Sequence, residues 1–117
     1  MNKTAVQVDL VYVDDETQTM RIHAIVANGK LAISEMYCHL MEWNGEKNEL
    51  QPLILNDEEG SFRSYKGEWG YGDESDVTFE FLDRPLAVDQ QVIRTDIASS
   101  ERDVYIYRIV AITDLLK

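Results

Sequence analysis

The loop at 70–76, GYGDESD, holds the residues best suited to bind a ligand, because it places three carboxylates close together beside two glycines. Asp73, Glu74 and Asp76 offer the oxygen ligands that Ca²⁺ prefers. Their spacing differs from that of the EF-hand loop, which takes ligands at alternating positions and ends on a distant glutamate. We therefore favour a solvated acidic turn over a calcium site, and predict no bound metal.

Two aromatic residues, Trp69 and Tyr71, flank Gly70 at the start of this loop. Rings beside a glycine turn can form a platform on which a ligand stacks, and they can equally fill the end of a β-protein core. We favour the second interpretation, in which both rings fill the end of the core. Both rings nevertheless join the three acids as candidate binding residues.

The chain offers no convincing nucleophile. Cys38 and His39 are adjacent, so on a strand their side chains point to opposite faces and cannot form a nucleophile–base pair. Cys38 is expected to be a small buried hydrophobic residue. His23 and His39 belong to no ligand-spaced metal motif. With no phosphate-binding loop or nucleophile elbow either, we predict no catalytic residue and no cofactor.

Segments of alternating apolar and polar residues dominate the chain and predict β-strands. Asn28-Gly29 marks a tight turn between two of them, since both residues tolerate positive φ. Within 31–43 the apolar residues fit either a strand, which we favour, or a short helix within 34–43. The remaining strands are predicted over 4–13, 19–27, 50–55, 61–69, 75–82, 88–97 and 103–113.

Three of these segments allow more detailed predictions. The strand at 103–113 is apolar on both faces and should be central, with little surface left for water. The segment 50–55 contains Pro52, which lacks a backbone N–H and predicts an edge strand. In 88–97 the better apolar face is that of Ile93, Thr95 and Ile97, which we expect to point inward.

Regularly spaced short strands predict an all-β protein. We expect one domain over 1–117, an antiparallel β-sandwich of about eight strands with immunoglobulin-like architecture. The Cys…Trp…Cys spacing of antibody domains is absent. An open β-barrel is the alternative.

The alternation of strand direction then predicts where the acidic residues gather. If successive strands run antiparallel, alternate loops emerge at the same end of the fold. One end would receive the loops near 14–18, 44–48, 70–76 and 98–102. This adds Asp14, Asp15 and Glu16 to the candidate binding residues. The eight carboxylates expected at this end are Asp14, Asp15, Glu16, Glu46, Asp73, Glu74, Asp76 and Glu101.

The formal net charge of −11, from 22 acidic and 11 basic side chains, opposes direct binding to nucleic acids or anionic membranes. Apolar runs of four residues are too short for a transmembrane helix. One cysteine and no evident signal peptide favour the cytoplasm. We therefore predict a non-catalytic binding or protein-interaction module with a basic or cationic partner. The alternatives are a small enzyme or ligand-binding domain with a site built from scattered residues, and an acidic mimic of nucleic acid that acts as an inhibitor.

Overall fold

The computed structural model describes residues 3–43, 45–57, 59–69, 76–98 and 101–116. Strand accounts for 73% of the structure and no helix occurs in these residues. None of the described chain therefore forms a helix long and apolar enough to cross a membrane. The strands are β1 (Lys3–Tyr12), β2 (Asp15–Ala27), β3 (Lys30–Leu31), β4 (Glu35–Trp43), β5 (Asn48–Asn56), β6 (Ser64–Trp69), β7 (Asp76–Glu80), β8 (Gln91–Ala98) and β9 (Glu101–Asp114).

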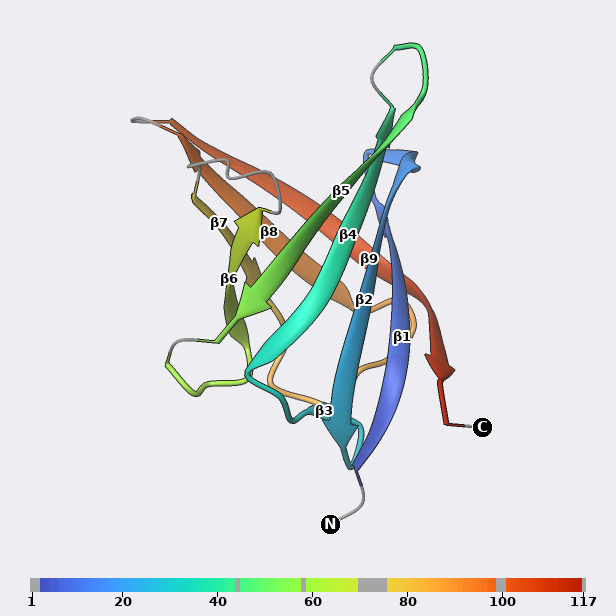
Figure 1. Cartoon of the computed structure of the whole chain (residues 1–117), viewed down its shortest axis with the longest axis vertical. Coiled ribbons are helices and arrows are strands. Elements are labelled where there is room, and N and C mark those ends of the chain that lie inside the picture. Colours follow the sequence, from blue (N-terminus) through green and yellow to red (C-terminus); the bar gives the residue numbers. More distant parts are fainter. Residues whose placement is uncertain (1–2, 44, 58, 70–75, 99–100, 117) are drawn as a thin grey trace.

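These strands form one antiparallel sheet in the order β1-β9-β8-β7-β6-β5-β4-β2-β3, and β1 also pairs with β2 (Figure 1). That pairing closes eight of the strands into an up-and-down barrel, with the short β3 appended to β2. The all-β prediction is confirmed, whereas the sandwich with immunoglobulin-like architecture is wrong. The barrel alternative is correct, although the barrel is closed. Sandwich and barrel both bury one face of each strand, so alternation alone does not distinguish them.

The last strand, β9, pairs with β8 along one side and β1 along the other. It is central, as predicted, but its outer face is open to solvent, with Val104 55% exposed. The register shifts opposite Asp9 and Leu10, which leaves one extra residue, Val110, in β9. Because of this bulge, the inward-facing side chain that follows Ile109 is that of Ile112, which packs against the core.

The ambiguous segment 31–43 forms the favoured strand over Glu35–Trp43, and Cys38 is buried as predicted, together with Met36 and Leu40 on the same face. The edge prediction for 50–55 is wrong, because β5 pairs with both β4 and β6. Among the described residues, β5 pairs with β6 from Leu53 to Asn56, and Pro52 itself pairs with His39 of β4.

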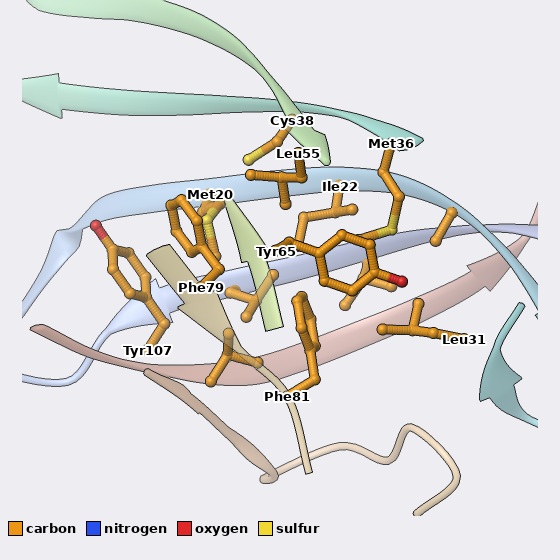
Figure 2. Close-up of a cluster of buried hydrophobic side chains, with 14 of the residues drawn as sticks. Met20, Ile22, Leu31, Met36, Cys38, Leu55, Tyr65, Phe79, Phe81 and Tyr107 are labelled. Atoms are coloured by element: carbon orange, nitrogen blue, oxygen red, sulfur yellow. The ribbon is translucent and has the colours of Figure 1, made fainter. Parts of the chain in front are cut away.

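The barrel interior is filled by side chains (Figure 2). Tyr65 lies on β6, and its hydroxyl donates to the carbonyl of Ile33 at 2.7 Å. Its ring meets Phe81 edge-on at 5.6 Å between centroids. The inward faces of β1 and β2 are those that alternation predicts. Their buried residues are Val6, Val8 and Leu10 on β1, and Met20, Ile22, Ala24 and Val26 on β2.

One strand, β8, is turned the opposite way from the prediction. Ile93 and Ile97 are each 37% exposed, whereas Val92 and Arg94 are buried. The prediction followed hydrophobicity, and the interior instead takes the face that carries Val92, Arg94 and Asp96. A cation is thus enclosed by the barrel, where it must be neutralised by its neighbours.

Candidate functional site

The strands β1, β4, β6 and β8 all end at the same end of the barrel, because neighbouring strands are antiparallel (Figure 1). We call this the acidic end, and the opposite one, with the β5–β6 and β7–β8 connections, the far end. The structure places Trp69, Asp76, Asp14, Asp15 and Glu16 at the acidic end. Tyr71, Asp73 and Glu74 lie outside the described residues. That this set binds a partner stays a prediction.

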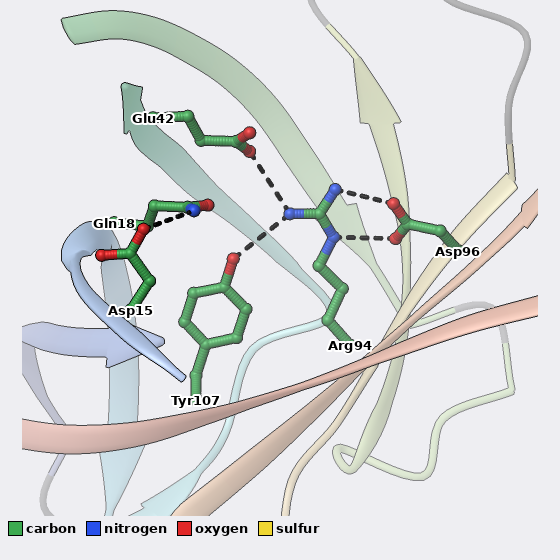
Figure 3. A network of polar contacts seen from close by, with 6 residues as sticks. All are labelled: Asp15, Gln18, Glu42, Arg94, Asp96 and Tyr107. Carbon is green, nitrogen blue, oxygen red and sulfur yellow. Dashed lines mark hydrogen bonds and ion pairs between the residues drawn. The ribbon is translucent and has the colours of Figure 1, made fainter. Parts of the chain in front are cut away.

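Arg94 of β8 extends inside the barrel toward the acidic end, with its side chain 10% exposed. Its Nε and Nη2 each donate to one oxygen of Asp96 at 2.7 Å (Figure 3). Its Nη1 donates to the Tyr107 hydroxyl at 3.2 Å and to Glu42 Oε1 at 3.4 Å. The Arg94 guanidinium therefore connects β8 to β9 through Tyr107 and, across the barrel, to β4 through Glu42.

Aromatic rings lie close to the guanidinium. Its carbon lies 4.9 Å from the centre of the Tyr105 ring and 5.6 Å from that of Trp69. Tyr12 extends the cluster, with its ring 5.6 Å from Tyr105 and 5.7 Å from Tyr107. Trp69 packs against the core, which agrees with the interpretation favoured from the sequence. Its indole N–H is buried and has no hydrogen-bond partner among the described residues.

The protonation of this network is fixed by its hydrogen bonds. Burial opposes charge on Arg94, but the bonds to Asp96 and the neighbouring Tyr107 outweigh it and raise the pKa of the guanidinium. Burial also raises the pKa of Tyr107, although the nearby Arg94 charge opposes this. Arg94 therefore remains a cation and Tyr107 a neutral phenol at any ordinary pH.

The rim of the acidic end is formed in part by the β1–β2 hairpin. Asp15 accepts hydrogen bonds from Thr17 Oγ1 at 2.6 Å, the Thr17 backbone N–H at 3.1 Å, and Gln18 Nε2 at 3.1 Å. These bonds lower the pKa of Asp15 and hold its carboxylate in place. Asp14 accepts from the Tyr12 hydroxyl at 3.2 Å and remains exposed.

At the acidic end of the barrel, Asp96 of β8 lies directly opposite Asp103 in the register of the neighbouring strand β9. Like charges opposite one another repel, so this part of the wall favours a nearby cation. Arg94 supplies one such cation. The described carboxylates at the acidic end outnumber the cations there, even when Lys66 and Arg108, the ion-pair partners of Asp76 and Glu16, are included: Asp14, Asp15, Glu16, Glu42, Glu46, Glu49, Asp76, Asp96, Glu101 and Asp103 against Lys47, Lys66, Arg94, Arg102 and Arg108.

The usual catalytic side chains lie elsewhere. Cys38 is fully buried and its pKa is strongly raised by that burial. Both histidines lie on the outer wall, where their rings are 5.8 and 5.5 Å from Tyr37. This proximity was not foreseen from the sequence. No group of three His, Cys, Asp or Glu side chains in the described residues is arranged to hold a metal ion.

Sequence reasoning missed the enclosed part of this site, which consists of Glu42, Arg94, Asp96, Tyr105 and Tyr107. One signal was present: Arg94 and Asp96 stand two residues apart, so they share a face and can pair. Comparison with known protein families, with curated proteins and with solved structures finds no match for this chain.

Proposed function

We propose that this protein is a non-catalytic binding module whose acidic end engages a cationic group, such as the basic side chains of a partner protein. The excess of carboxylates over cations at that end is the observation that supports the proposal. Such a field attracts cations and speeds the encounter with a basic surface.

The surroundings of Arg94 suggest how a cation would be held. Its guanidinium already sits among two carboxylates and two aromatic rings. Carboxylates together with ring faces are the usual partners of a lysine or arginine side chain. After Arg94 neutralises one of Glu42 and Asp96, one negative charge remains at the inner wall. The rim acids add further charge around it.

The proposal is tested by titrating the protein with a short oligolysine peptide, and separately with oligoglutamate of equal length, by calorimetry at low salt. We expect oligolysine alone to bind, with an affinity that falls as salt is added. The test variant is Asp14→Asn, Glu16→Gln, Asp76→Asn. It neutralises three exposed carboxylates, two of which pair with Arg108 and Lys66, and leaves the hydrogen-bonded Asp15 turn intact.

A matched control removes three exposed carboxylates at the far end: Glu35→Gln, Glu59→Gln, Asp83→Asn. The two triple variants have the same net charge and remove it at opposite ends of the barrel, and each breaks at least one exposed ion pair, including Lys30–Asp83 in the control. We expect the acidic-end variant to weaken oligolysine binding more than the control. Equal weakening would mean that the peptide responds only to total charge, and the proposal would be wrong.

A further inference from the structure

At the far end, a cavity of about 560 Å³ opens beside the connection between β7 and β8. Its wall includes two arginines, Arg63 and Arg84, and an apolar part formed by Leu82, Val88 and Ile93, all exposed. A volume of this size suits a small organic molecule, and such sites combine apolar walls with a few polar groups.

The connection that forms one wall of the cavity is anchored to the barrel. The Leu86 N–H donates to the Gly29 carbonyl at 2.9 Å, and the Asp89 N–H donates to the Ile109 carbonyl at 2.8 Å. The Gln90 side chain closes the segment on itself, with Nε2 donating to the Pro85 carbonyl at 3.0 Å. The cavity is therefore shaped by fixed backbone, which reduces the entropy lost when a ligand binds.

Arg63 is positioned by a second structured turn. The buried Asp57 accepts hydrogen bonds from the Phe62 N–H at 2.6 Å and the Ser61 N–H at 3.1 Å. Phe62 is held at a φ of 55°, in the left-handed region that a non-glycine residue seldom occupies. This turn delivers Arg63 to the cavity from the β5–β6 connection, while Arg84 comes from the β7–β8 connection.

The charge balance of this cavity differs from that of the rest of the protein. In the described residues neither Arg63 nor Arg84 forms an ion pair. Two carboxylates also line the cavity, but Asp89 is paired with Arg108 at 3.0 Å. Glu80 is then the one lining carboxylate that forms no ion pair in the described residues. Asp83, which stands between the lining residues Leu82 and Arg84, is paired with Lys30 at 3.0 Å, and Arg63 also contributes to lowering its pKa. Two arginines without a close ion-pair partner therefore face the cavity of a chain whose net charge is −11.

From this combination we infer that the cavity binds a small organic anion, with a carboxylate or phosphate held by Arg63 and Arg84 and an apolar body against Leu82, Val88 and Ile93. Guanidinium groups donate forked hydrogen bonds to either anion. The apolar part of the ligand would cover the exposed apolar side chains of the cavity, and removing this surface from water would favour binding. This site lies at the end of the barrel opposite the proposed cation-binding end, and the inference does not rest on that proposal. Arg108 connects the two regions, since it pairs with both Glu16 and the cavity residue Asp89.

Four probes with the same chain test the inference: octanoate, octyl phosphate, octanol and octylammonium, each kept below the concentration at which it aggregates. Binding is followed by amide shifts in nitrogen-15 NMR spectra of the whole protein. We expect the two anions to shift residues around the cavity, and the alcohol and the amine to bind at least tenfold more weakly. The stronger of the two anions identifies the preferred headgroup.

Variants separate charge recognition from apolar adsorption. Arg63→Gln, Arg84→Gln should weaken binding of the anions roughly tenfold or more, since two charge-assisted contacts are lost. Glu80→Gln should strengthen it several-fold, because the opposing carboxylate is gone. A control that removes two exposed cations outside the cavity, Lys3→Gln, Arg102→Gln, should leave the affinity nearly unchanged.

Several results would overturn the inference. These are equal binding of octanoate and octylammonium, shifts confined to another surface, no shifts up to millimolar probe, or unchanged affinity in the double arginine variant. All of the substituted side chains are exposed, so the variants should fold, and circular dichroism checks this before titration.

Discussion

Replacing Arg94 by methionine is the sharpest test of the enclosed ion network. Methionine keeps most of the volume and the apolar stem but removes the guanidinium. Asp96 and Glu42, with side chains 25% and 28% exposed, are then left half-buried without their cation. The Tyr107 hydroxyl also loses the hydrogen bond that it accepts from Arg94.

The expected cost follows from these exposures. Removing one partner of a fully buried pair costs about 3–5 kcal/mol. Water reaches both carboxylates here and screens part of the charge, so we expect Arg94→Met to lower the free energy of unfolding by about 2–3 kcal/mol. Against a typical total of about 5–15 kcal/mol, the variant should still fold.

A double-mutant cycle with Asp96→Asn isolates the pair, with the free energy of unfolding measured by urea denaturation. Asn removes the charge at Asp96, so methionine at 94 should cost less in that background. We expect the double variant to be more stable than the summed single effects predict, by about 1–2 kcal/mol. Arg102→Met, at an exposed cation of the same end, should change stability by no more than about 0.5 kcal/mol. Strict additivity, or an Arg94→Met cost equal to that of the control, would refute the role assigned to the network.

Three further predictions concern other parts of the barrel. Gly67→Ala should destabilise the protein by about 1–3 kcal/mol in urea denaturation, because the new Cβ would lie 2.6 Å from Val77 Cγ1; an unchanged midpoint would contradict the packing described. The Cys38 thiol should react slowly with a thiol reagent until denaturant is added, since burial raises its pKa; rapid reaction of the native protein would show that the thiol is accessible. Burial opposes ionisation of Asp57, but the Phe62 and Ser61 N–H groups outweigh it and lower its pKa below 3.8. Its contribution to stability is therefore present above pH 3.8 and lost as the pH falls through the folded-state pKa, and Asp57→Asn should flatten that acid loss.

Local features of the fold could be predicted because they depend on neighbours in sequence. The alternation in β1 and β2 identifies their buried faces. The Asn28-Gly29 turn has φ values of 54° and 80°, and it joins Ala27 directly to Lys30 through a two-residue loop. The strand that follows is shorter than expected, because β3 ends at Leu31 and the main strand begins only at Glu35.

Closure of the barrel could not be predicted in this way. It depends on β1 pairing with β9, as between Val8 and Ile112, which lie more than 100 positions apart along the chain. A single sequence carries no signal for such a pairing beyond the apolar character of both strands. The same apolar character is compatible with two packed sheets.

The orientation of β8 was mispredicted for a different reason. Hydrophobicity favours Ile93, Thr95 and Ile97 over Val92, Arg94 and Asp96, and it assumes that the interior is apolar throughout. Near the mouth of the barrel that assumption fails. Partners from three other strands, Glu42 on β4, Trp69 on β6, and Tyr105 and Tyr107 on β9, make an interior arginine tolerable there. Single-strand patterns contain none of these partners.

The packed core between the two ends has a consequence for both proposed sites. Tyr65, Phe79 and Leu55 are fully buried inside the barrel, so packed side chains of the described residues separate the acidic end from the cavity beside the β7–β8 connection. A cation bound at one end and an anion bound at the other would interact only weakly across that distance in salt. Neutralising the acidic-end carboxylates should therefore leave octanoate binding nearly unchanged, and Arg63→Gln, Arg84→Gln should leave oligolysine binding nearly unchanged. Strong coupling between the two titrations would instead indicate either transmission through Arg108, which pairs with both Glu16 and Asp89, or a change in the conformation of the barrel on binding.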